Sequence, residues 1–238
     1  MVDMNMPGGG RGVLEGAFAL LEAVERAGES RLTALAAESG LPKTTARRLL
    51  EQLVELGAVE RSGGLFRMGS RMFRLGLGWQ PHPGMLALAR RPVHELARAT
   101  GATVGIFVLR EGRALTAAAV PGEWDAFAPM RAGTAFPWTT AAGKVLVAGA
   151  PAGLPVEPPS RAWSREAAQI REAGFAVDRQ EVAEGVCCVA VPLRGRSGTA
   201  VAALCALVDP SQPLSPLTAS VVRTGRVISA TMQGRPGR

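Results

Sequence analysis

The chain has 238 residues, of which 47% are hydrophobic and 20% charged, as is typical of a globular protein with material for two modest cores. Its formal charge of +7 suits a polyanionic partner, although an arginine-rich genome would produce the same excess. The absence of a long apolar run and the presence of three cysteines argue against a membrane protein and against a disulfide framework. We therefore expect a cytoplasmic protein with no membrane contact.

The first helices can be placed from periodicity and capping residues. Residues 1–11 are rich in glycine and predict a disordered tail. Apolar residues at helical spacing follow from Val13 and stop at Gly28, which predicts a first helix. A second short helix is expected after Thr33 as its N-cap, with Gly40 as a left-handed C-cap.

A third helix is predicted from Pro42 to about Leu56, with two contrasting faces. Its apolar stripe comprises Ala46, Leu49, Leu50, Leu53 and Leu56. The opposite face carries Lys43, Thr44, Thr45, Arg47 and Arg48 near the N-terminus. A DNA recognition helix needs short polar and basic side chains on its first turns, because that end enters the major groove. This pattern therefore predicts that the third helix binds DNA.

Two short strands, 58–61 and 65–68, are expected to form a hairpin around the glycines of the intervening turn. Helix, helix, turn, helix and hairpin in this order predict a winged helix-turn-helix over residues 12–69. The expected partner is double-stranded DNA, with Thr33 as a further DNA-binding residue and the wing residue Arg67 placed to contact phosphate or the minor groove. A winged helix that contacts protein rather than DNA is the alternative.

A connecting helix and a hinge rich in proline and glycine are predicted over residues 70–84, before a second domain over 85–233 and a tail over 234–238. Helices of that domain are expected from Leu86 to Thr100, 139–150, 164–173 and 216–232, and strands over 102–109, 114–120, 127–131, 175–179, 185–193 and 199–208. A proline-rich loop is expected over 151–159. This mixture indicates an α+β domain with an antiparallel sheet.

Several motifs resemble those of the isocitrate lyase regulator (IclR) family of bacterial transcriptional regulators. In chain order they are Leu32-Thr33-Ala34-Leu35-Ala36, Ser39 to Thr45, Arg48-Leu49-Leu50, Phe66-Arg67-Met68-Gly69, Gly133 to Pro137, Thr140 to Lys144, and Glu181 to Pro192. Each motif alone is weak evidence, but together they span roughly residues 12–233 in the expected order. The resemblance implies a GAF-like effector-binding fold for the second domain.

The resemblance also implies a small-molecule pocket between the sheet and the helix that follows Thr140. Carried over position by position, its residues are Trp138, Ala141, Ala142, Asp178, Cys188, Cys205 and Leu207. Trp138 stands near the usual position of a histidine, and Cys205 and Leu207 replace two frequent serines. Fewer hydroxyls and an added tryptophan favour a partly apolar or aromatic organic acid. The alternatives are that the two cysteines and Trp138 are plain core residues and that Asp178 is an ordinary loop or strand-end carboxylate.

The expected function is allosteric regulation of transcription, with repression as the usual outcome in the family. A homodimer is expected to bind a palindromic operator, whereas pairing of dimers into tetramers is left open. Leu14, Phe18 and Leu21 of the first helix, with the connecting helix, are the candidate dimer contacts. We expect no cofactor, metal or enzymatic activity, because His82 and His94 lack metal-ligand spacing with the cysteines. A cysteine-dependent enzyme is the remaining alternative.

Overall fold

The computed structural model describes residues 12–126, 128–150 and 161–234. Two compact units meet in the sequence between Gln80 and Pro81. The predicted tail 1–11, the predicted loop 151–159 and most of the tail 234–238 lie outside the described residues. None of the helices in the described part is long and apolar enough to cross a membrane.

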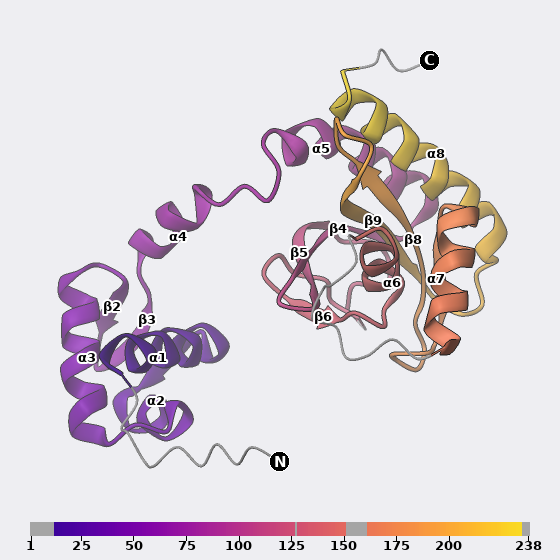
Figure 1. Cartoon of the computed structure of the whole chain (residues 1–238). Helices are drawn as coiled ribbons and strands as arrows, with labels where there is room; N and C mark the ends of the chain where they lie inside the picture. Colours follow the sequence, from indigo (N-terminus) through magenta and orange to yellow (C-terminus); the bar gives the residue numbers. More distant parts are fainter. Residues whose placement is uncertain (1–11, 127, 151–160, 235–238) are drawn as a thin grey trace, which may run out of the picture. The chain divides into compact units, whose positions relative to one another are not determined.

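The N-terminal unit is a winged helix-turn-helix, as predicted (Figure 1). Its elements are α1 (Val13–Ala27), β1 (Glu29–Arg31), α2 (Leu32–Ser39), α3 (Lys43–Glu55), β2 (Val59–Ser62), β3 (Leu65–Met68) and α4 (Ser70–Leu77). The three strands form an antiparallel sheet in the order β1-β3-β2. Strand β1 was not predicted, because three residues are too few to show alternation and only pairing with β3 makes them a strand.

Two local predictions in this unit are wrong. The N-cap of α2 is Arg31 rather than Thr33, because the chain passes directly from β1 into the helix. Leu56 follows the last turn of α3 and is 55% exposed, so it does not extend the buried stripe. The predicted C-cap is confirmed, since Gly40 adopts a left-handed φ of 66° that few other residues tolerate.

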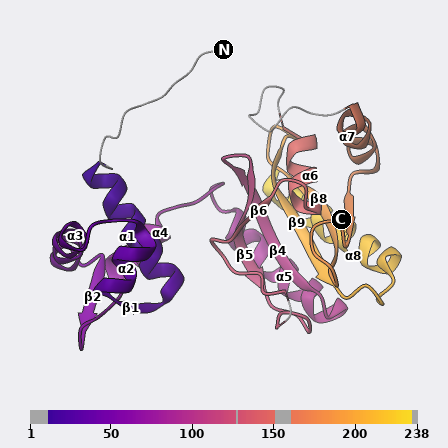
Figure 2. The ribbon, with the colours of Figure 1, turned by 90° about the horizontal axis from the view of Figure 1, so that it is seen from below.

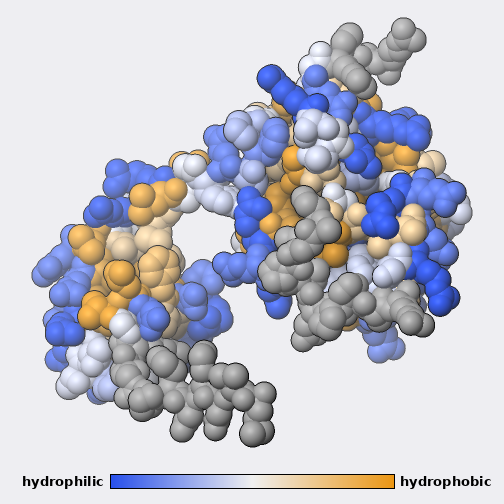
Figure 3. All heavy atoms as spheres, viewed as in Figure 1, coloured by the Kyte–Doolittle hydropathy of each residue, from blue (hydrophilic) through white to orange (hydrophobic). Residues whose placement is uncertain are grey.

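The core of the unit is built from the apolar faces of α1, α2 and α3 and from Phe66 of β3. Leu21 belongs to this core and is only 8% exposed, which corrects its assignment as a dimer contact. Leu14 and Phe18 of α1 and Phe73 of α4 are instead 61–76% exposed. Figure 3 shows hydrophobic side chains gathered on the visible face of this unit. An apolar surface of this kind is typical of a protein interface.

The C-terminal unit is an α+β domain with an antiparallel sheet, also as predicted. Its elements are α5 (Met85–Thr100), β4 (Thr103–Arg110), β5 (Arg113–Val120), β6 (Ala135–Pro137), α6 (Ala141–Ala148), α7 (Arg161–Ala173), β7 (Ala176–Arg179), β8 (Cys187–Arg194), β9 (Ala200–Val208) and α8 (Leu214–Met232). The strand order is β6-β5-β4-β9-β8-β7. The prediction of a strand over 127–131 is wrong, because its described residues 128–131 form no strand. The outer strand beside β5 is instead β6.

Helices cover both faces of this sheet (Figure 2). One core lies between the sheet and the pair α5 and α8, and a second lies between the sheet and the pair α6 and α7. Side chains alternate between the two faces along each strand. Cys187 therefore packs in the first core, while its neighbour Cys188 packs against the second.

Candidate DNA interface and effector pocket

Helix α3 presents the predicted basic face to solvent. Ala46, Leu49 and Leu50 hold the helix against the core, since all three are buried. The predicted residues on the other side are exposed, namely Lys43, Thr44, Arg47 and Arg48, and Thr45 is half-buried. The backbone amides of the first turn receive no side-chain cap from Pro42. The leading turns of α3 can therefore meet a polyanion with both side chains and amides.

A hollow of about 280 Å³ lies beside α3, between the start of α2 and the wing formed by β2 and β3. Its lining residues are Arg31, Leu32, Thr33, Lys43, Arg47, Glu51, Arg61, Gly64 and Phe66. The structure thus brings three predicted DNA contacts, Thr33, Lys43 and Arg47, to one place. Sequence reasoning missed Arg31 and Arg61, because their proximity depends on the pairing of both β1 and β2 with β3.

Arg67, the predicted wing contact, is engaged inside the wing itself. Its Nε and Nη2 donate to Oε2 of Glu60 at 3.1 and 2.9 Å. Glu29 of β1 and Glu60 of β2 stand opposite Arg67 on either side of β3. Two carboxylates in register with one guanidinium offset its charge, which weakens the case for Arg67 as a phosphate ligand.

The second site is a cavity of about 340 Å³ in the C-terminal unit, on the α6 side of the sheet. It contains six of the seven predicted effector residues: Ala141, Ala142, Asp178, Cys188, Cys205 and Leu207. The remaining lining residues are Phe107, Ala128, Pro129, Met130, Phe136, Thr140, Val182, Ala183, Glu184 and Val186. The cavity is therefore mostly apolar, with a few polar groups at the helix start and on β7 and β8, as ligand sites usually are.

Trp138 does not line this cavity. Its ring packs edge-on against Trp163 of α7, with 4.8 Å between the ring centroids. The backbone of Trp138 instead supports the start of α6, because a Cβ added to Gly143 would lie 2.3 Å from its carbonyl oxygen. Thr140 caps this start, as its Oγ1 accepts a hydrogen bond from the Gly143 amide at 3.2 Å. Trp138 therefore bears on the pocket through the position of α6 and is not among the residues that line the cavity.

Asp178 is the buried carboxylate of the cavity, with 4% of its surface exposed. Burial raises the pKa of Asp178 above its ordinary value, and the negative charge of Glu181 adds to this effect. The Glu181 amide, which donates to Oδ1 of Asp178 at 2.8 Å, and the positive charge of Lys144 partly offset it. The carboxyl can thus take up a proton more readily than an exposed aspartate.

Lys144 of α6 ties the loop beside Asp178 to the helical layer. Its side chain is only 8% exposed, and Nζ lies 2.7 Å from Oε1 of Glu166 on α7 and also donates to Glu181. Burial lowers the pKa of Lys144, but these two carboxylates outweigh it and raise the pKa. The charged lysine therefore fixes Glu181, next to the pocket residue Val182, against α6.

Two of the pocket residues, Cys188 and Cys205, are free cysteines that lie side by side on β8 and β9. A hydrogen bond between Cys188 and Cys205, together with burial, raises the pKa of Cys188 well above its ordinary value. His82 and His94 lie outside the cavity, before and within α5. A thiol with a raised pKa is a poor nucleophile, so Cys188 suits ligand packing better than covalent catalysis.

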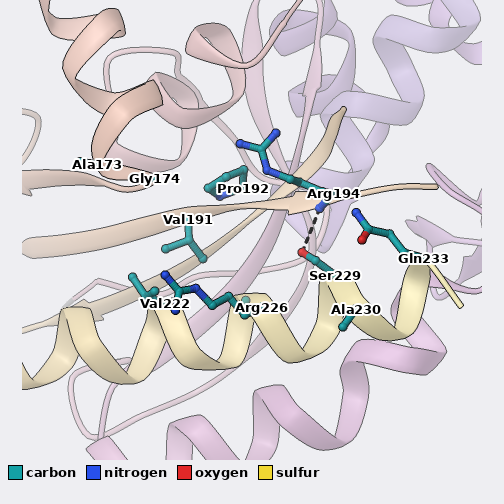
Figure 4. A pocket seen from close by; sticks show the side chains of 11 residues that line it. Ala173, Gly174, Val191, Pro192, Arg194, Val222, Arg226, Ser229, Ala230 and Gln233 are labelled. Atoms are coloured by element: carbon teal, nitrogen blue, oxygen red, sulfur yellow. Dashed lines mark hydrogen bonds between the residues drawn. The ribbon is translucent and has the colours of Figure 1, made fainter. Parts of the chain in front are cut away.

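A second hollow of the C-terminal unit, about 350 Å³, lies between α8, the end of α7 and the last residues of β8 (Figure 4). Strand β7 pairs with β8 only as far as Ala190, which leaves an open sheet edge from Val191 onward. Pro192 has no amide hydrogen there, and the Arg194 amide donates to Oγ of Ser229 at 3.0 Å. The edge is thus protected against strand addition, and the hollow contains none of the predicted effector residues.

Comparison with known proteins matches both units to one family. The model "IclR helix-turn-helix domain" matches residues 13–63, and the model "Bacterial transcriptional regulator IclR C-terminal" matches residues 160–218. The HTH-type transcriptional regulator XynR of Escherichia coli is 31% identical over 198 residues, which cover 76% of this chain and 79% of that protein. The chain belongs to the IclR family. It is accordingly a DNA-binding transcriptional regulator with a C-terminal effector domain.

Solved structures of the IclR family share the fold over nearly the whole chain. An IclR homologue from Microbacterium hydrocarbonoxydans, crystallised with 4-hydroxybenzoate, superposes with a TM-score of 0.82 at 21% identity, over 94% of this chain and all of that one (100%). The IclR protein of Thermotoga maritima gives a TM-score of 0.74 at 22% identity, over 92% and 98% of the two chains. These structures share the fold, while the family models and the XynR relative confirm the IclR resemblance inferred from sequence motifs.

Proposed function

We propose that this IclR-family regulator is a repressor that releases its operator when a small molecule fills the cavity of the C-terminal unit. One observation carries the proposal: a single cavity collects Ala141, Asp178 and Cys205 from three separate elements. Such convergence of a few polar groups in an apolar cavity is typical of a ligand site. A ligand that binds one conformation of the domain more tightly would shift the population of DNA-binding dimers.

The DNA contacts we propose are Lys43, Thr44, Thr45, Arg47 and Arg48 of α3 together with Thr33. Exposure of the basic face of α3 supports this assignment, whereas the Glu60 ion pair argues against Arg67. We also propose that the protein is a homodimer on a palindromic operator, acting in the cytoplasm where the DNA lies. The exposed apolar residues of α1 and α4 support the dimer, because isolated monomers seldom expose so much hydrophobic surface.

The effector we propose is an aromatic organic acid. Phe107, Met130 and Phe136 provide an apolar wall, and the start of α6 offers backbone amides for a carboxylate. Because Thr140 occupies the Gly143 amide, the donors would be those of Ala141 and Ala142. The structure of a relative crystallised with 4-hydroxybenzoate supports this class of ligand. The raised pKa of Asp178 allows the carboxyl to be protonated beside an anionic ligand.

A thermal-shift screen of aromatic and aliphatic acids tests the effector class, with 4-hydroxybenzoate as the first probe. A true ligand present at about 100 times its Kd stabilises the folded protein by about 2.7 kcal/mol. The variant Ala142→Leu should abolish this shift, because its larger side chain would project into the cavity. Stabilisation by aliphatic acids alone, or by aromatic acids equally in the variant, would refute the proposed ligand class.

A cysteine-dependent enzyme is not the function we propose. The raised pKa of Cys188 keeps its thiol protonated, which is opposite to what a nucleophile requires. The relatives are transcriptional regulators, which agrees with a binding role for the cavity.

A further inference from the structure

The hollow beside the recognition helix has a marked excess of positive charge. Four basic side chains line it, Arg31, Lys43, Arg47 and Arg61, against one carboxylate, that of Glu51, so that its formal charge is four minus one, or +3. All five side chains are exposed to solvent. A concentration of guanidinium groups of this kind favours a phosphate, which two arginines can bind with paired hydrogen bonds.

The register of the wing sheet determines which arginine faces this hollow. Arg61 of β2 stands opposite Phe66 of β3, and its guanidinium carbon lies 5.5 Å from the centroid of the Phe66 ring. Phe66 is buried in the core against the helices, so Arg61 lies on the helix side of the sheet. Arg67 is the next residue of β3 after Phe66 and therefore points to the opposite face.

Arg31 reaches the same hollow from the other side. It is the last residue of β1 and the N-cap of α2, where it offers no side-chain cap to the first-turn amides. Thr33, in that first turn, also lines the hollow. The site is thus bounded by a helix start, by the recognition helix and by the wing, and each boundary carries a hydrogen-bond donor.

We propose that this hollow binds one backbone phosphate of DNA, with Arg31 and Arg61 as its principal ligands. The inference rests on the proposed DNA contacts of α3 and adds a site that fixes the register of that helix on the duplex. Phosphate contacts position a protein on DNA without reading its sequence. Lys43 and Arg47 line the hollow and also belong to the exposed face of α3, so a phosphate bound there would lie next to the groove that α3 enters.

Salt-dependent binding of the full-length protein to a labelled random-sequence duplex tests the proposal without knowledge of the operator. The logarithm of the binding constant falls with the logarithm of salt concentration by about 0.9 for each phosphate neutralised. Because the two arginines hold the same phosphate and loss of either releases it, we expect Arg61→Gln and Arg31→Gln each to reduce this slope by about 0.9 per subunit. Equivalently, the affinity ratio between 50 and 200 mM salt should shrink about 3.5-fold for each phosphate that is no longer neutralised.

Arg67→Gln is the matched control, since it removes the same charge from the same wing but on the other face. It should leave the slope unchanged, and circular dichroism of all three variants verifies that they fold. If Arg67→Gln reduced the slope while Arg61→Gln and Arg31→Gln did not, the proposed phosphate site would be refuted. The proposed DNA contacts of α3 would not be affected by that result. Absence of salt-dependent binding by the unmodified protein would instead refute the proposed DNA contacts themselves.

Discussion

Gly143, in the first turn of α6 beside the pocket, leaves no room for one added carbon. A Cβ there would lie 2.3 Å from the carbonyl oxygen and 2.5 Å from the Cα of Trp138. Overpacking costs about 1–3 kcal/mol, and this contact belongs at the upper end because backbone atoms cannot move away by rotation about a side-chain bond. Alanine gains about 1 kcal/mol over glycine within a helix. We therefore expect Gly143→Ala to lower the free energy of unfolding by about 2 kcal/mol.

Urea unfolding followed by tryptophan fluorescence measures this change, because Trp138 and Trp163 report on the contact between the start of α6 and α7. Gly76→Ala is the matched control, as it makes the same change within α4 where no atom would lie within 4 Å of the new Cβ. The control should be neutral or stabilising by up to about 1 kcal/mol. An unchanged or higher stability of Gly143→Ala would refute the close seating of α6 on Trp138.

Three further predictions follow from the same structure. Burial raises the pKa of Asp178, so the folded state holds the proton of this carboxyl more tightly than the unfolded state does. The free energy of unfolding therefore falls as the pH rises above 3.8, the ordinary pKa of the side chain. In thermal unfolding, Asp178→Asn should be more stable than the unmodified protein at pH 7.5 and lose that advantage below pH 3.8. An advantage that does not depend on pH would contradict burial of the ionised carboxylate as the cause. Lys144→Met should leave Glu166 and Glu181 without their shared partner and speed proteolysis near Val182, whereas Lys43→Met, on the exposed face of α3, should not. Phe73→Ser should weaken the proposed homodimer about tenfold or more in light scattering, because a buried phenylalanine contributes about 1.5–3 kcal/mol; an unchanged dimer would place the interface elsewhere.

The regular elements were predictable because their signals are local. Hydrophobic periodicity located α1, α3 and α5, and Gly40 marked the end of α2. The two missed strands, β1 and β6, have three residues each and exist only by pairing with β3 and β5. A strand of that length carries no periodic signal of its own, so the sequence does not reveal it.

The candidate sites were predictable only where a sequence motif fixes the place of a residue on a strand or helix. Motif positions brought Asp178, Cys188 and Cys205 to one cavity, because the family fixes their places on adjacent strands. Trp138 was misassigned, since a position in the chain does not show which way a side chain turns, and its ring turns toward α7. Likewise, the ion pair of Arg67 depends on cross-strand register, which becomes visible only in the folded wing.

The central claim is that the leading turns of α3 hold DNA. Fluorescence anisotropy of a labelled DNA duplex, measured with Arg47→Ala/Arg48→Ala, tests it most directly. The control is Arg90→Ala/Arg91→Ala, which removes an equal charge from two adjacent exposed arginines of α5. We predict a loss of at least about thirtyfold in affinity for the α3 variant and little change for the control. Equal affinity of the α3 variant and the unmodified protein would contradict the account.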